Sequence, residues 1–177
     1  MKDTYLTLSK PCKGIYKEKG SKFLAFAFPV QEENDIKRRQ EEVRKAEHAA
    51  RHHCFAWKLG LDDNNYREND DGEPNNSAGK PILGQIVKYE LTDILIIVVR
   101  YFGGTKLGVG GLINAYRTAA ANALENGKIV KRQLQSHYQL NFEYDQMNSV
   151  MAMLKELDLH QYDQEFELDC ALKVSFP

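Results

Sequence analysis

Alternating apolar and polar positions predict strands near the start of the chain. The alternation occurs around Tyr5–Thr7 and Ile15–Tyr16, and a third apolar stretch, Phe23–Phe28, follows a turn at Gly20–Ser21. The period then changes, because the apolar positions within residues 33–50 share one face of a predicted helix. Those positions are Ile36, Val43, Ala46 and Ala50.

The middle of the chain predicts further strands and helices around a long polar loop. A strand over Cys54–Leu61 leads into residues 62–80, a polar segment whose length is typical of a functional loop. A helix over Lys80–Leu91 precedes a strand over Asp93–Arg100, whose continuous apolar character indicates cover on both faces. The inward residues are Ile82, Leu83, Ile86 and Val87 in this helix, and Ile113, Tyr116, Ala120 and Leu124 in a later helix that stops at Asn126-Gly127.

A second unit is predicted over residues 131–177. Alternation over Tyr138–Tyr144, a helical period over Met147–Leu157 and renewed alternation over Phe166–Phe176 give the order β-α-β, or β-α-β-β if residues 159–166 form their own strand. This order opens a ferredoxin-like domain that lacks its second helix and final strand. A last strand this apolar would leave one edge and one face of the sheet uncovered. Either the domain is shortened, or a second molecule covers that face.

Length, charge and cysteine content narrow the class of protein. The 177 residues suit one medium domain or two small ones, and a net charge of −1 excludes a globally basic nucleic-acid binder. The longest apolar run, Ile94–Val99, is too short to span a bilayer, and the first residues lack the apolar stretch of a signal peptide. Three scattered cysteines without a CxxC pair indicate reduced thiols. We therefore expect a soluble, cytoplasmic protein of mixed α and β structure.

A glycine loop joins the strand ending at Arg100 to the helix that follows. Five of the nine residues from 103 to 111 are glycine, and exposed backbone N–H groups at a helix start can bind phosphate. Gly108-Val109 departs from the Walker A motif, and Ile113 stands where a dinucleotide fingerprint has its third glycine. The alternative is a tight crossover whose glycines only relieve crowding. The candidate residues for binding an anion or nucleic acid are Arg100, Gly103, Gly104, Lys106, Gly108, Gly110, Gly111 and Arg117, together with Lys80.

Two neighbouring histidines and a cysteine invite a metal or nucleophile interpretation. On a strand, His52 and Cys54 share one face while His53 points to the other. Two ligands are too few for a structural zinc site, and no third group that would orient a Cys–His pair is visible. This pattern favours a core cysteine beside a partly exposed histidine.

An acidic loop offers the remaining candidate chemistry. It contains Asp71 and Glu73 but lacks the ligand spacing of an EF-hand, so we predict no metal site, with these two acids as the nearest candidates. No motif calls for a cofactor. If the loop folds beside Lys80 and Arg100, the four side chains would form an enzyme-like composite site.

Several motifs resemble the signature of the IMPACT family, which includes the YigZ-like bacterial proteins. The resemblance covers roughly residues 15–125 and keeps the family's spacing through the glycine loop without a gap. The matching residues are Lys19–Phe23, His52, Cys54, Ala56, Asp70–Pro74, Ala78–Pro81, Ile82-Leu83, Ile86, Leu91, Ile97-Val98, Arg100–Gly104 and Leu107-Gly108.

The resemblance implies an α+β fold and a link to translation. It implies an N-terminal β/α sandwich like domain 2 of ribosomal protein S5 over residues 1–130, and over residues 131–177 a small, truncated ferredoxin-like unit like the last domain of elongation factor G. Both folds recur in proteins that touch RNA or the ribosome, and eukaryotic members are linked to translational control. The resemblance transfers no catalytic residues. The departure from the family pattern is the short C-terminal unit.

We therefore expect a non-enzymatic regulator of translation that binds RNA, the ribosome or a translation factor through the glycine loop. A phosphate or sulfate ion would bind at the same loop. One alternative is an enzyme acting on a phosphorylated small molecule or nucleotide. Another is a protein-interaction module that forms a homodimer through the C-terminal sheet.

Overall fold

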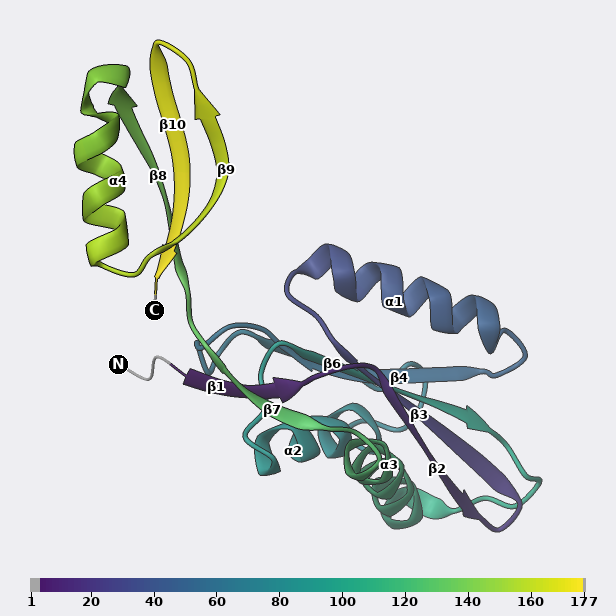
Figure 1. Cartoon of the computed structure of the whole chain (residues 1–177). Helices are drawn as coiled ribbons and strands as arrows, with labels where there is room; N and C mark the ends of the chain where they lie inside the picture. The colour runs from purple at the N-terminus through teal and green to yellow at the C-terminus, as the bar shows by residue number, and fades with distance from the viewer. Residues whose placement is uncertain (1–3, 177) are drawn as a thin grey trace. The chain divides into compact units, whose positions relative to one another are not determined.

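The computed structural model describes residues 4–176 and divides into two compact units (Figure 1). The N-terminal unit comprises Tyr5–Arg132, and the C-terminal unit begins at Gln133. Their likeness to ribosomal protein S5 and to a ferredoxin-like domain stays a prediction. No helix within the described residues is long and apolar enough to cross a membrane.

A five-stranded antiparallel sheet forms the centre of the N-terminal unit. Its strand order is β2-β3-β6-β4-β5, and every neighbouring pair runs antiparallel. A separate two-stranded ribbon pairs β1 with β7. The bounds are Thr4–Leu8 for β1, Cys12–Glu18 for β2, Ser21–Pro29 for β3, His52–Lys58 for β4, Tyr66–Asn69 for β5, Ile94–Tyr101 for β6 and Ile129–Gln133 for β7.

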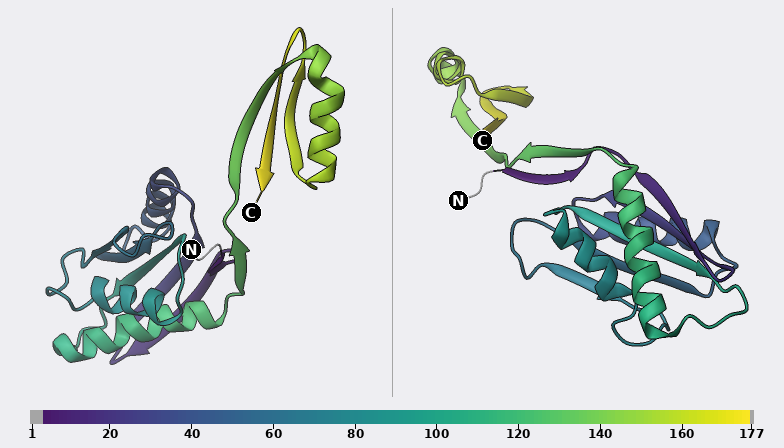
Figure 2. Two further views of the ribbon diagram at one scale, coloured as in Figure 1. Left: turned by 90° about the vertical axis from the view of Figure 1, so that its left-hand side faces the viewer. Right: turned by 90° about the horizontal axis from the view of Figure 1, so that it is seen from below.

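Helices cover both faces of this sheet. Figures 1 and 2 show α1 (Glu33–Ala46) on one face, and α2 (Gly79–Lys88) and α3 (Gly108–Glu125) on the other. Every residue of β6 except Tyr101 is buried, because its side chains alternate between the two cores. The prediction that this strand is covered on both faces is therefore confirmed.

The first helix is shorter than its apolar pattern predicts. It ends at Ala46, where the Glu47 N–H still donates to the Val43 carbonyl, and the chain then turns toward β4. Ala46 is exposed, whereas Ala50 reaches the core from the turn rather than from the helix. Periodicity could not reveal this, because a buried alanine fits a helix and a turn equally well.

Two more local predictions needed correction. Val87 is exposed rather than inward, since α2 turns only Ile82 and Ile86 fully into the core. The polar segment after β4 contains a short strand, β5, which pairs with β4 through its backbone. Backbone pairing at a sheet edge needs no apolar side chains, so the hydrophobic pattern gave no signal for it.

The C-terminal unit has the order β-α-β-β, which is the longer of the two predicted connectivities. Its sheet order is β8-β10-β9, with antiparallel pairs, so the apolar β10 is the central strand rather than an edge. The elements are β8 (Ser136–Glu143), a 3₁₀ turn (Tyr144–Gln146), α4 (Met147–Glu156), β9 (His160–Phe166) and β10 (Asp169–Phe176).

The expectation that β10 leaves an apolar face uncovered is wrong. Leu172 and Val174 of β10 pack with Leu154 of α4 in a small core. The opposite face of β10 carries Lys173 and Ser175, which are polar. One basis for dimerisation is thereby removed, and a homodimer through this unit stays a prediction that light scattering over a range of concentrations would test.

His53 is a buried histidine that should make stability depend on pH. It is 5% exposed on the α1 side of the sheet, its Nε2–H donates to the Glu47 carbonyl, and its Nδ1 is buried without a partner in the described chain. Burial, and to a smaller extent Arg44, lowers the His53 pKa. The folded protein therefore favours the neutral ring, whereas the unfolded chain protonates this ring near pH 6.5.

We expect the free energy of unfolding to rise between about pH 5 and pH 7, because below the ordinary histidine pKa the unfolded state binds the extra proton. Urea titrations at several pH values would measure this rise. The His53→Phe variant should show a shallower rise over the same range. An unchanged pH slope in that variant would show that His53 does not cause it.

Candidate functional site

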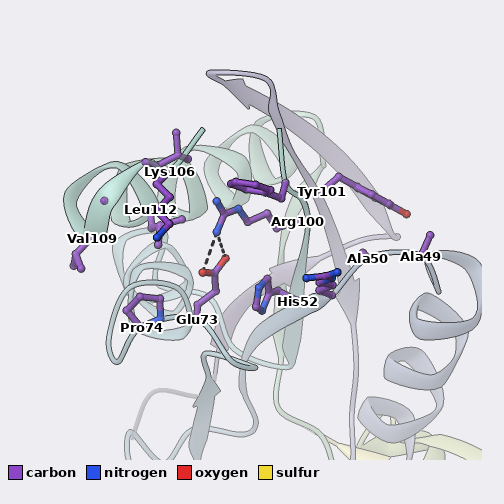
Figure 3. A pocket seen from close by; sticks show the side chains of 14 residues that line it. Ala49, Ala50, His52, Glu73, Pro74, Arg100, Tyr101, Lys106, Val109 and Leu112 are labelled. Carbon is purple, nitrogen blue, oxygen red and sulfur yellow. Dashed lines mark hydrogen bonds and ion pairs between the residues drawn. The ribbon is translucent and has the colours of Figure 1, made fainter. Parts of the chain in front are cut away.

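A pocket of about 710 Å³ lies where β6 runs into the glycine loop. Figure 3 shows its lining side chains, which come from the acidic loop, the start of β4, the end of β6 and the start of α3. The lining residues are Ala49–His52, Glu73, Pro74, Arg100–Phe102, Lys106–Val109 and Leu112.

A buried ion pair forms the floor of this pocket. Arg100 Nη1 lies 2.7 Å from Glu73 Oε1 and 3.0 Å from Oε2, and the two side chains are only 8% and 4% exposed. The Tyr116 hydroxyl also donates to Glu73 Oε1, at 2.7 Å. Burial, more than its neighbours Cys54 and Glu73, raises the pKa of Tyr116, so this hydroxyl keeps the proton that it donates.

Two aromatic rings lie against the Arg100 guanidinium. Its Cζ lies 5.6 Å from the centre of the Phe23 ring and 5.5 Å from that of Phe102, which suits a cation–π contact with each. Phe23 is fully buried, whereas Phe102 is 60% exposed. Arg100 is therefore locked in place, and part of the Phe102 ring is open to a ligand.

The acidic loop is shaped by its own carboxylates. Asp70 Oδ1 accepts the N–H groups of Ala78 and Gly79 at the start of α2, at 3.0 and 2.8 Å, and its Oδ2 accepts that of Asn76. A carboxylate at a helix start is favoured by the unpaired N–H groups and by the helix dipole. Asp71 Oδ2 accepts the backbone N–H of His53 at 2.7 Å. Both acids therefore serve the structure of the loop.

Two residues of β4 also meet this loop. The Cys54 thiol donates to the Asp70 carbonyl at 3.0 Å, and burial raises its pKa, which removes it as a nucleophile at neutral pH. His52 Nδ1 lies 2.8 Å from the Asp71 carbonyl, and the ring lines the pocket. The prediction of a core cysteine beside a partly exposed histidine is confirmed, with His53 on the opposite face.

The glycine loop is held at one end and open at the other. The Gly103 N–H donates to Ser21 Oγ at 3.0 Å, and Gly103 packs directly on Gly20. At the other end α3 starts at Gly108, which has a φ of +70°, and no side chain in the described part of the chain caps the helix. The N–H groups of the first turn therefore remain available to solvent or an anion.

The structure gathers only part of the predicted anion site around the pocket. Arg100, Lys106 and Gly108 line it, and Glu73 of the composite site joins them. Asp71 stands behind His52 rather than in the pocket. The predicted residues outside the lining are Lys80, Gly103, Gly104, Gly110, Gly111 and Arg117. Within residues 4–176 no group of three or more His, Cys, Asp or Glu side chains could hold a metal ion.

Arg51 and His52 were not predicted as site residues, although both line the pocket. Their position could have indicated this role. Both residues stand at the start of a strand beside the central strand, and His52 pairs in register with Arg100. Arg51 makes the charge of the pocket more positive. Three cations, Arg51, Arg100 and Lys106, now line it with a single carboxylate, Glu73. With Arg100 paired to Glu73, the charges of Arg51 and Lys106 remain to attract an anion.

Comparisons with known proteins fit this architecture. The sequence model of the Impact N-terminal domain matches residues 19–124, which include every residue of the pocket. YigZ of Escherichia coli, an IMPACT family member, is 32% identical over 99% of this chain and 87% of its own length. YvyE of Bacillus subtilis, also of this family, is 34% identical over 77% of this chain and 63% of its own length.

The fold is likewise shared with a solved structure. The crystal structure of an hypothetical protein superposes with a TM-score of 0.81 at 32% identity, covering 100% of this chain and 87% of that one. This agreement confirms the predicted α+β class. Because the domain match spans the whole pocket and a relative matches almost the full chain, this chain belongs to the IMPACT family.

Proposed function

We propose that the protein regulates translation by binding single-stranded or looped RNA at this pocket. The single observation that carries the proposal is that one cavity combines an exposed aromatic ring, Phe102, with two cations, Arg51 and Lys106, which have no ion pair within residues 4–176. A positively charged groove with stacking rings is the usual way in which proteins bind single-stranded nucleic acid. The link to translation comes from the family resemblance.

The pocket supports a specific division of roles. A phosphate beside Lys106 would also meet the free N–H groups at the start of α3, which begins at Gly108. Arg51 stands in the same lining and would bring a second positive charge to the backbone. A base would stack on the exposed part of Phe102, whose ring already contacts the Arg100 guanidinium.

Replacing Arg51 and Lys106 together by alanine should weaken binding of a short oligouridine. The dependence of log K on log salt should also become shallower by about 0.7 for each lost phosphate contact. Fluorescence polarisation over a salt series measures both quantities. A matched control is the Lys80→Ala, Arg117→Ala double variant, which removes the same charge from exposed sites outside the pocket. An equal loss in the control would contradict the pocket as the binding site.

A second candidate function is catalysis on a phosphorylated small molecule or nucleotide. The volume of the pocket, about 710 Å³, favours it, because small-molecule sites fall in this size range. A thermal-shift screen of phosphorylated metabolites and nucleotides would find a stabilising ligand, and Lys106→Ala should abolish the shift. If no compound shifts the unfolding temperature while oligouridine binds, the RNA function stands and this one fails.

A further inference from the structure

A hydrogen bond to the acidic loop fixes which nitrogen of the neutral His52 ring carries the proton. Its Nδ1 lies 2.8 Å from the backbone carbonyl oxygen of Asp71. A carbonyl oxygen can only accept a hydrogen bond, so Nδ1 must carry the proton. In the neutral ring the other nitrogen, Nε2, therefore holds a lone pair and acts as an acceptor.

The acidic loop fixes the orientation of this ring. A side-chain carbon built at Gly72 would lie 3.4 Å from His52 Nδ1, so the loop backbone packs against that edge of the ring. The carbonyl that receives the bond is itself held, because the Asp71 carboxylate accepts the neighbouring His53 N–H at 2.7 Å. His52 cannot turn Nε2 toward the loop without losing the bond to Asp71.

The lone pair of Nε2 is unused. Nε2 has no hydrogen-bond partner among residues 4–176, and the ring stands beside Glu73 in the pocket lining (Figure 3). The cations of the pocket, Arg51 and Lys106, can only donate hydrogen bonds. Glu73 already accepts from Arg100 and Tyr116. A ligand whose phosphate lies near these cations would therefore find a hydrogen-bond acceptor, His52 Nε2, in the same pocket.

We infer that His52 accepts a hydrogen bond from the ribose 2′-hydroxyl and so makes the pocket select RNA over DNA. The inference rests on the proposed function and names the feature of the ligand that the pocket distinguishes. A 2′-hydroxyl is the group by which a protein tells the two nucleic acids apart at a given contact. DNA has no donor at this position, so its complex lacks this hydrogen bond.

The test compares three single strands of one sequence on the full chain. These are oligouridine, the matching oligodeoxyuridine, and 2′-O-methyl oligouridine, which keeps the ribose oxygen but has no proton to donate. Fluorescence polarisation should show RNA binding about fivefold more tightly than either analogue, the value of one net hydrogen bond. His52→Phe keeps an aromatic ring without an acceptor, and it should bind all three strands with equal affinity.

The outcomes separate this inference from the proposed function. If RNA and DNA bind equally, or if the 2′-O-methyl strand binds as tightly as RNA, His52 does not accept from the hydroxyl and the inference fails while RNA binding stands. Retention of the preference in His52→Phe would overturn it as well. If none of the strands binds the natural protein, the proposed function itself fails. A urea unfolding curve of His52→Phe, followed by the fluorescence of Trp57 in β4, shows whether the variant is folded.

Discussion

Glu73→Ala should destabilise the N-terminal unit by about 3–5 kcal/mol, the range for removing one partner of a buried ion pair. Arg100 is 8% exposed, so its charge would remain buried without a counterion. The Tyr116 hydroxyl would lose its acceptor at the same time. Urea unfolding followed by the fluorescence of Trp57, the single tryptophan, reports on this unit because that residue lies in β4.

Two further variants separate the ion pair from a general effect of losing a carboxylate. Glu41→Ala removes an exposed carboxylate from α1 and should change stability by less than about 0.5 kcal/mol. Glu73→Gln combined with Arg100→Met removes both charges, and it should recover much of the loss because no buried charge is left unpaired. If Glu73→Ala lowers the free energy of unfolding by no more than Glu41→Ala does, the buried Arg100 guanidinium does not need Glu73 as its counterion.

The central layer of this unit was predictable because its residues carry a strong hydrophobic signal. The run from Ile94 to Val99 indicated a strand covered on both faces, and β6 has that place in the middle of the sheet. The helices α2 and α3 followed from apolar residues at helical spacing, among them Ile82 and Tyr116. Such patterns show which side chains are buried, and buried side chains form the contacts between the sheet and its helices.

The pocket was less predictable because it depends on contacts between distant loops. Glu73 and Arg100 were proposed as neighbours in a composite site, and they form an ion pair across 27 positions of sequence. The partner of Asp71 could not be predicted, since a loop carboxylate can be satisfied by any nearby N–H group. His52 enters the pocket because the chain leaves α1 early and turns into β4, and no periodicity encodes that turn.

The C-terminal unit also has a feature that the sequence pattern does not determine. Its alternating apolar residues correctly predicted strands, but the pattern does not state the order of strands in the sheet. β10 was expected to expose an edge, whereas it lies between β8 and β9 under α4. Strand order depends on the edge of the sheet at which each connecting segment places the next strand. In a unit this short, several such placements are sterically allowed.

Gly103→Ala should destabilise the N-terminal unit by about 3 kcal/mol, at the upper end of the cost of overpacking. A side-chain carbon at this position would lie 1.9 Å from the carbonyl carbon of Gly20 and 2.2 Å from the Ser21 nitrogen. Both are backbone atoms, so no side-chain rotation relieves the clash. The turn between β2 and β3 would have to move away from the end of β6. Urea unfolding followed by Trp57 fluorescence would measure the loss.

Gly110→Ala is the matched control within the same loop. Gly110 lies in the first turn of α3 with open space around its α-carbon, so alanine there should be neutral or stabilise by up to about 1 kcal/mol. Equal stability of the two variants would show that the Gly20 contact tolerates a side chain. A loss confined to Gly103→Ala would instead show that this glycine is required by close backbone packing.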